Sequence, residues 1–436
     1  MPQANKDLFT ADFKDTSYWW EAAPQETAVP GTPPAAADVA VVGSGFTGLN
    51  DAIDLARAGR SVVVFDSDNL GHGASKRNFG FVGMSLKHSF RTLQKRYGTP
   101  YAIEVYKEMR GAFDAVAERV QSEQISCHFN VCGRLILART KRQHDDLTDE
   151  FATREKHIGT KFSVMTGAAV RSQIASDLYY GAALIPELAS IHPGLYHAGL
   201  LARARSAGVT LLGATPVTRV EANGKEFDVK TPRGITRARD VLIATNGYSG
   251  PAVPWVQRRM IPFDAYVIAT EELAPGQMEK ILPQDRTFID HAHNIISVRR
   301  SPDGKRIIFL WRTGTRPTSA KEKGALLHSD AAKIIPEIAK LKISHSWTGR
   351  CAGTFDLWPH VTTHKGIHVA GGYCFAGLPM GTYLGRKAAA RIMGRPEGRT
   401  VFADRSFPTI PGYRGGSWFM PFVMKGYDLM DLWERR

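Results

Sequence analysis

The sequence is poor in the features that mark secreted and membrane-spanning chains. Its 436 residues include only four cysteines, Cys127, Cys132, Cys351 and Cys374, and none of them forms a CxxC pair. That number is too small for a disulfide framework and fits a reducing compartment. No run approaches the ~18 apolar residues that a spanning helix needs, and no apolar signal core follows the first residues. These absences predict a cytoplasmic protein without a transmembrane segment.

Acidic residues are also in deficit. The chain has 56 lysines and arginines against 42 aspartates and glutamates, which gives a formal net charge of +14. This balance favours anionic partners such as phosphorylated cofactors, acidic substrates or an anionic surface. The basic residues are spread along the chain without a basic block, and neither zinc-finger spacing nor an RNP-like aromatic run is present. We therefore expect no nucleic-acid partner.

Metal-ligand spacing and a catalytic triad are absent as well. His291 and His293 form an HxH pair, but no third ligand stands at a recognisable spacing. We therefore expect no metal site.

The first positive signal begins after a Pro/Ala-rich segment. An apolar run at 39–42 precedes Gly43-Ser44-Gly45-Phe46-Thr47-Gly48, a helical pattern follows, and a second apolar run at 62–65 ends at Asp66. The three glycines allow a tight turn, close approach to a pyrophosphate and close packing of helix on strand. The helix N-terminus would face the phosphates and Asp66 the ribose. The unit therefore predicts an adenine dinucleotide.

A glycine-rich loop behind the second run indicates which dinucleotide this is. Residues 71–83 read GHGASKRNFGFVG, where a NAD-binding unit would carry a helix. The segment is similar to the GxGAS-x-RN-x-G loop of the D-amino-acid-oxidase-like (DAO) flavoproteins, which include glycine oxidase, sarcosine oxidase, D-amino-acid dehydrogenase and gamma-glutamylputrescine oxidase. This resemblance implies FAD held without a covalent bond. Cys351 and His72 are the positions at which covalent attachment stays open.

Further segments extend the resemblance over roughly residues 17–433. Tyr18-Trp19-Trp20 is similar to a motif of the gamma-glutamylputrescine oxidase branch, and residues 191–196, 240–248 and 347–359 are similar to other motifs of the family. Residues 371–381 read GGYCFAGLPMG. In the family, such a loop places backbone N–H groups at the pyrimidine edge of the flavin, where they stabilise negative charge.

The resemblance implies an α/β fold with two domains. One is a Rossmann-like FAD-binding domain of the glutathione-reductase type, and the other is a substrate domain with an antiparallel or mixed sheet. The expected boundaries are an N-terminal arm at 1–37, a discontinuous FAD-binding domain at 38–100, 190–250 and 345–400, a substrate domain at 101–189 and 251–344, and a C-terminal tail at 401–436.

The resemblance also implies site residues. Those expected to hold FAD are Gly43, Gly45, Phe46, Thr47, Gly48, Asp66, Ser67, Ala74, Ser75, Arg77, Asn78, Gly80, Phe81, Val217, Gly372, Gly377, Leu378 and Met380. Among substrate residues, we expect Arg299 and Arg350 to clamp a carboxylate. Tyr373 is expected to face the flavin ring.

The implied function is oxidation of the C–N bond of a primary or secondary amine or an amino acid. A hydride passes to flavin N5, the imine product is hydrolysed, and oxygen or another acceptor takes the electrons. Three departures bear on this function: Phe375 and the pair Leu310-Trp311 stand where the family usually has glycine, and the strand at 307–312 has no lysine. A non-catalytic FAD-binding subunit and a flavin-dependent hydroxylase therefore stay open as alternatives.

The C-terminal tail carries an apolar stripe. Its members are Phe419, Phe422, Val423, Tyr427, Met430 and Trp433. Peripheral membrane contact is one interpretation, and packing of the stripe against the body of the protein is the favoured one.

Overall fold

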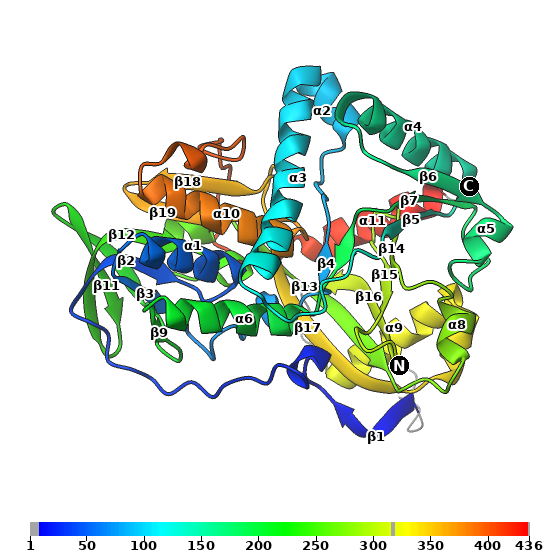
Figure 1. Cartoon of the computed structure of the whole chain (residues 1–436), viewed down its shortest axis with the longest axis horizontal. Coiled ribbons are helices and arrows are strands. Elements are labelled where there is room, and N and C mark those ends of the chain that lie inside the picture. Colours follow the sequence, from blue (N-terminus) through cyan, green and yellow to red (C-terminus); the bar gives the residue numbers. More distant parts are fainter. Residues whose placement is uncertain (1–7, 315–318, 435–436) are drawn as a thin grey trace.

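Two large sheets and their helices form the computed structural model, which describes residues 8–314 and 319–434 (Figure 1). The first sheet runs in the order β10-β11-β12-β2-β3-β9, and β19 pairs with both β12 and β18. Its strands are β2 (Ala36–Val42), β3 (Val62–Phe65), β9 (Thr210–Leu212), β10 (Arg219–Asn223), β11 (Glu226–Thr231), β12 (Gly234–Ile243), β18 (His360–His364) and β19 (Ile367–Gly371).

Apolar β-branched residues build the parallel centre of this sheet. β2 and β3 pair in parallel from Val39 opposite Val62 to Val42 opposite Phe65, which confirms the two strands expected at 39–42 and 62–65. Valine-rich runs suit strands that are covered on both faces. The helices α1 (Phe46–Arg57), α6 (Pro193–Ser206) and α10 (Gly377–Ile392) lie together on the sheet, and α1 contacts both of the others.

The second sheet is mixed and has nine strands in the order β1-β17-β13-β16-β15-β14-β5-β7-β6. The pairs β1–β17 and β14–β5 are parallel, and the other neighbours are antiparallel. The strands are β1 (Phe9–Lys14), β5 (Arg134–Ala138), β6 (Ser163–Thr166), β7 (Gly181–Ile185), β13 (Ile261–Thr270), β14 (Thr287–Asp290), β15 (Ser297–Arg300), β16 (Ile307–Gly314) and β17 (Ile343–Gly353).

Shorter elements connect and cover the two sheets. A small antiparallel pair, β4 (Phe81–Val82) with β8 (Ala189–Ser190), lies between them. The other helices are α2 (Phe90–Tyr97), α3 (Thr99–Ser122), α4 (Lys141–Ile158), α5 (Ala168–Arg171), α7 (Pro254–Gln257), α8 (Gln277–Ile281), α9 (Ala320–Ile334) and α11 (Met420–Glu434). Among the helices of the described residues, none is both long and apolar enough to cross a membrane.

Strand pairing and helix packing place three segments in a different unit from the one we expected. β1 lies within the expected arm but joins the nine-stranded sheet, where Phe9 and Phe13 pack on its core. β17 also belongs to that sheet, although we expected 345–400 in the FAD-binding domain. α3, expected in the substrate domain, packs its buried face on α10 instead. We propose two units centred on the two sheets with these boundaries changed; residues 1–7 and 435–436 lie outside the described part.

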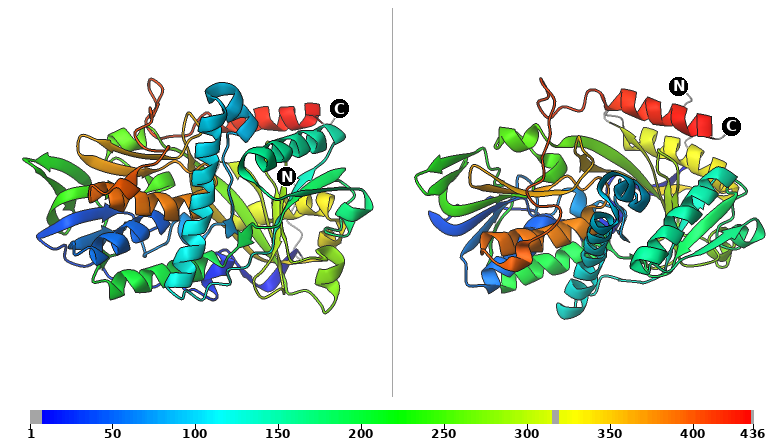
Figure 2. Two further views of the ribbon diagram at one scale, coloured as in Figure 1. Left: turned by 45° about the horizontal axis from the view of Figure 1, so that its top comes forward. Right: turned by 90° about the horizontal axis from the view of Figure 1, so that it is seen from above.

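The favoured interpretation of the tail stripe is wrong for three of its six members, whereas Phe419, Val423 and Tyr427 are partly buried. Phe422 and Trp433 are 73% and 70% exposed, and Met430 is also exposed. The inward face of α11 combines polar and aromatic contacts. The Asp431 carboxylate accepts hydrogen bonds from the backbone N–H groups of His293 (2.8 Å) and Asn294 (3.2 Å), and the ring of Tyr427 stacks on His293. Figure 2 shows α11, in red, along the outside of the molecule.

Candidate active site

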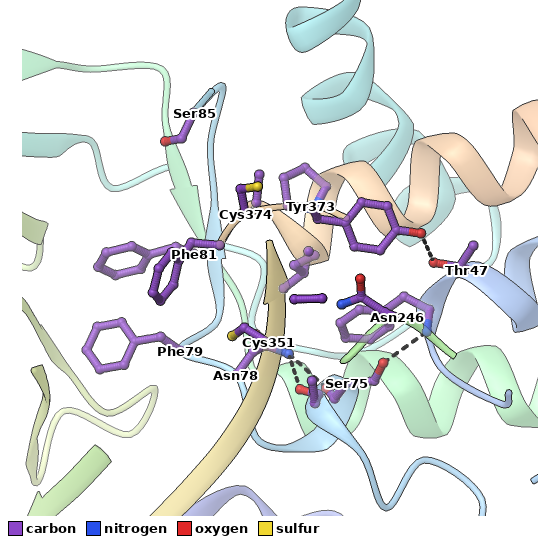
Figure 3. Close-up of a pocket in the computed structure, with 18 of the residues that line it drawn as sticks. Thr47, Ser75, Asn78, Phe79, Phe81, Ser85, Asn246, Cys351, Tyr373 and Cys374 are labelled. Atoms are coloured by element: carbon purple, nitrogen blue, oxygen red, sulfur yellow. Dashed lines mark hydrogen bonds between the residues drawn. The ribbon is translucent and has the colours of Figure 1, made fainter. Parts of the chain in front are cut away.

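One cavity of about 1300 Å³ runs between the two sheets. Its lining begins at the loop after β2, passes the end of β3 and both glycine-rich loops, and reaches β5, β14 and β16 of the nine-stranded sheet. Figure 3 shows part of this lining, with Thr47 on one side of the view and Phe81 and Ser85 on the other. The cavity therefore joins the dinucleotide fingerprint to the sheet of the second unit.

The fingerprint glycines occupy positions that a side chain would fill. A Cβ at Gly48 would lie 2.0 Å from the carbonyl oxygen of Gly43, and a Cβ at Gly45 would lie 2.9 Å from Ser75 Oγ. Gly43 has a φ of +109°, which a residue with a side chain rarely adopts. These contacts leave the first turn of α1 open toward the cavity, where its backbone N–H groups suit a pyrophosphate.

Asp66 lies at the end of β3 and lines the cavity. Its carboxylate accepts a hydrogen bond from the Ser44 backbone N–H at 2.9 Å, and burial raises its pKa. Ser67 and Val217 line the cavity beside it. This is the placement expected for the ribose and adenine end of a dinucleotide.

The loop 71–83 is fixed by its own polar side chains. Ser75 Oγ accepts a hydrogen bond from the Phe46 backbone N–H at 3.0 Å, and Asn78 Oδ1 accepts one from the Gly80 N–H at 2.9 Å. The guanidinium of Arg77 donates to the carbonyl oxygens of His72 and Thr348. The loop is therefore held against both α1 and β17, with Ala74, Ser75, Asn78 and Phe81 at the cavity.

The glycine-rich loop at 371–381 (the second flavin loop) lines the middle of the cavity. The Gly372 N–H donates to Asn246 Oδ1 at 2.9 Å, and the Tyr373 hydroxyl shares a 2.6 Å hydrogen bond with Thr47 Oγ1 (Figure 3). Tyr373, Gly377 and Leu378 line the cavity. This loop therefore connects residues 244–248, which read ATNGY, to the phosphate-binding turn at 43–48.

Five of the residues expected to hold FAD do not line the cavity. Four of them support a loop: Gly48 packs on Gly43, Arg77 and Gly80 hold the loop at 71–83, and Gly372 has a φ of +77° at the turn of the loop at 371–381. Met380 lies inside α10 and is buried in the core.

Neither arginine expected at the substrate lines the cavity. Arg299 is 3% exposed, and its Nη1 group lies within hydrogen-bond distance of the carbonyl oxygens of Phe79, Gly80 and Ile191. Arg350 is half exposed and pairs with Asp264, with Nε 3.1 Å from Oδ1. The structure corrects both expectations, because the guanidinium groups are already engaged elsewhere.

Among the described residues, five cations that the sequence did not indicate line the cavity: Lys87, Lys107, Arg110, Arg134 and Arg154. Arg110 pairs with Glu187 and Arg154 with Glu150. Arg134 follows Gly133 at the start of β5, and its guanidinium lies over the ring of Phe81 at 4.1 Å. Lys87 Nζ lies 5.2 Å from the ring centre of Phe375. The available signal for Arg134 was a charged residue at the start of an apolar strand, Arg134-Leu135-Ile136-Leu137.

Cys351 lines the cavity, and burial raises the pKa of its thiol to about 12. A thiol with so high a pKa is a poor nucleophile. FAD held without a covalent bond to that residue stays a prediction.

The comparisons with known proteins agree with this geometry. The model of the family "FAD dependent oxidoreductase" (DAO) matches residues 38–391. Gamma-glutamylputrescine oxidoreductase of Escherichia coli is 28% identical over 404 residues, covering 90% of this chain and 92% of that protein. Glycine oxidase of Geobacillus kaustophilus has a solved structure that is 22% identical, with a TM-score of 0.72, covering 87% of this chain and 99% of that one.

A second solved structure, L-amino acid deaminase of Proteus myxofaciens in complex with anthranilate, has a TM-score of 0.69 at 16% identity, covering 88% of this chain and 96% of that one. At such identity, the two structures establish the fold. The chain is an FAD-dependent oxidoreductase of the amine and amino-acid oxidase type, and it belongs to the DAO family of FAD dependent oxidoreductases.

Proposed function

We propose that this protein oxidises the C–N bond of a primary or secondary amine or of an amino acid. The observation that carries the proposal is the continuous cavity, which extends from the phosphate-binding turn past the second flavin loop to the nine-stranded sheet. A dinucleotide seated on α1 leaves the far end of this cavity for a second molecule. Bound FAD would supply the hydride acceptor, and the resulting imine would react with water to give a carbonyl compound and an amine.

The residues of this chain would position the two molecules. The turn at 43–48, together with Asp66 and Ser67, would hold the phosphates and ribose, and Val217 the adenine. Ser75, Asn78 and the second flavin loop would lie along the rest of the cofactor. The Tyr373–Thr47 hydrogen bond would keep the two loops at a fixed separation.

The relatives narrow the substrate class. Gamma-glutamylputrescine oxidoreductase matches over most of both chains, and glycine oxidases also match. We therefore propose an amino acid or an N-substituted polyamine as substrate. A substrate that arrives with a neutral amine needs no separate general base for hydride transfer.

The open cavity favours this function over the two alternatives. Phe375, Leu310 and Trp311 were expected to fill the pocket of a non-catalytic subunit, whereas Phe375 and Leu310 stand in the wall of a cavity of about 1300 Å³ and Trp311 does not line it. The family match and the amine-oxidising relatives favour amine oxidation over hydroxylation.

The test is the visible spectrum of the purified protein under anaerobic conditions. We expect a flavin band that bleaches when one pool of amines or amino acids is added. Readmission of air then distinguishes rapid oxygen use from dependence on another acceptor. A protein that shows no flavin band after addition of FAD would contradict the proposal, as would a flavin that no amine reduces.

We also propose a peripheral contact of α11 with anionic membranes. The exposed apolar residues Phe422, Leu429, Met430 and Trp433 recur on one side of the helix. Lys425 and Asp428 are both exposed on the same helix, and the Asp428 carboxylate accepts a hydrogen bond from Asn294 Nδ2. Asp431 is buried against the loop at 293–294. An apolar stripe with aromatic ends and an exposed cation is typical of helices that lie in a membrane interface.

A further inference from the structure

Arg134 is a buried cation that has no carboxylate partner among the described residues. It is 2% exposed, lines the cavity, and has no ion-pair partner among residues 8–314 and 319–434. Its Nε donates to Thr287 Oγ1 at 3.1 Å, but its Nη2 has no hydrogen-bond partner in the described part of the chain. Burying a charge in this way destabilises a fold unless something compensates it.

The packing around Arg134 holds its guanidinium at the wall of the cavity. Gly83 makes room for the guanidinium itself, since a Cβ at that position would lie 2.4 Å from Arg134 Nη1. Phe81 covers one face of the guanidinium. In Figure 3, Phe81 lies across the view from Thr47 at the phosphate-binding turn, so this cation is at the end of the cavity away from the pyrophosphate.

The carboxylates at this end of the cavity are already paired. Glu150 pairs with Arg154 and accepts the backbone N–H of Phe90 at 2.8 Å. Glu187 pairs with Arg110, and Asp290 pairs with Arg139. Lys87, by contrast, faces the cavity and has no ion-pair partner in the described residues. The substrate end of the cavity therefore carries a surplus of positive charge.

We propose that Arg134 binds a carboxylate of the substrate, so that the substrate is an amine that also carries a carboxylate group. The guanidinium can donate two hydrogen bonds to one carboxylate. Gly83 accommodates the guanidinium, and Phe81 packs on one of its faces. This inference rests on the proposed function and narrows its substrate class.

The test uses two probes that differ only in the carboxylate. Anthranilate carries an amine and a carboxylate on one aromatic ring, and aniline lacks the carboxylate. In both, the carbon that bears the nitrogen has no hydrogen to transfer, so neither probe is consumed. Isothermal titration calorimetry on the FAD-loaded protein at pH 7.5 gives both dissociation constants without any turnover.

We expect the protein to bind anthranilate at least about 30-fold more tightly than aniline, since losing one partner of a buried charged pair has a penalty of that order. Arg134→Gln should remove most of this preference while leaving the dissociation constant for aniline unchanged. Arg134→Lys should restore part of it. Lys225→Gln, at an exposed lysine between β10 and β11 that does not line the cavity, should keep the full preference and controls for net charge.

Two results would overturn the assignment. One is equal binding of the two probes by the unmodified protein, which decides the matter even if Arg134→Gln does not fold. The other is an Arg134→Gln variant that binds anthranilate as tightly as the unmodified protein. Failure of the proposed function is seen separately, as a flavin that no amine bleaches in a protein whose preference for anthranilate is intact.

Discussion

Phe375 holds a backbone conformation that suits glycine. Its φ is +79°, in the left-handed region, where a side chain costs about 1–2 kcal/mol. A glycine would adopt this conformation without that cost. That ring packs on Phe263, with 5.0 Å between ring centres.

Two substitutions separate the backbone strain from the ring contact. Phe375→Gly and Phe375→Ala both lose the contact with Phe263, but only alanine keeps a Cβ in the left-handed region. We expect the glycine variant to be more stable than the alanine variant by about 1 kcal/mol in urea unfolding of the FAD-loaded protein. Equal stability of the two variants would show that the loop relaxes to another conformation.

His197 is hydrogen-bonded to the backbone of the phosphate-binding turn at Ser44. It is fully buried, its Nε2 donates to the Ser44 carbonyl oxygen at 2.7 Å, and burial lowers its pKa to about 4. The unfolded chain gains this proton near pH 6.5, whereas the folded protein resists it until about pH 4. The stabilisation is therefore complete above pH 6.5 and is lost as the pH falls toward 4.

We expect flavin release on dilution to be several-fold greater at pH 5 than at pH 7.5. His197→Gln keeps an N–H donor of similar reach that does not titrate, so it should flatten this pH dependence. His192 and His345, whose pKa values burial also lowers to about 4, remain in that variant and serve as the internal control. An unchanged profile in the glutamine variant would assign the effect to those residues.

At the scale of elements, the N-terminal segment is hydrogen-bonded to the glycine-rich loop at 71–83. Trp19, in the short 3-10 turn Tyr18–Trp20, is fully buried, and its Nε1 donates to the Asn78 carbonyl oxygen at 2.8 Å. Lys76 Nζ donates to the Pro24 carbonyl oxygen at 2.9 Å. The loop is therefore fixed to the N-terminal segment, which precedes the first strand of the FAD-binding sheet in the sequence.

Trp19→Phe keeps an aromatic ring but removes this hydrogen bond. We expect a loss of about 1–2 kcal/mol in stability, because the Asn78 carbonyl loses its donor, and a several-fold weaker affinity for FAD. Fluorescence titration of the apoprotein with FAD measures the affinity. Trp433→Phe, at an exposed tryptophan on α11, is the matched control and should change neither quantity.

The same scale shows what the sequence could and could not predict. The strands at 39–42 and 62–65 and the helix between them follow from local patterns, because valine runs, three glycines and helical spacing each act over a few residues. β1 was missed although Phe9, Ala11 and Phe13 alternate along it. Its partner, β17, lies more than 300 residues away, and no local pattern specifies so distant a pairing.

The arginines show why the substrate-binding residues of the site were harder to predict than the strands. The carbonyl oxygens that engage Arg299 come from two segments more than 100 residues away along the chain. Whether an arginine is engaged or open therefore depends on tertiary packing, which spacing does not reveal. For this reason the motif residues at the cofactor were predictable, whereas Arg134 was not.

At the scale of the whole molecule, charge and exposed apolar surface act together. The net charge of +14 attracts the chain to anionic surfaces. On α11, the inward face is held by Asp431, and Tyr427 stacks on His293 with 5.7 Å between ring centres. Because Tyr427 also lines the cavity, a membrane bound at the outer face of α11 would lie close to the substrate end of the site.

We expect the FAD-loaded protein to sediment with vesicles that contain phosphatidylserine and to remain in solution with neutral phosphatidylcholine vesicles. Replacing Phe422, Leu429 and Trp433 together by serine should reduce sedimentation at least tenfold, since the apolar area buried in the interface is lost. Val29→Ser, at an exposed apolar residue far from α11 in the sequence, should leave it unchanged. If the triple variant instead converts a dimer to a monomer and the protein ignores both kinds of vesicle, the stripe covers a second copy of the chain, because a dimer interface would bury the same apolar residues without needing an anionic surface.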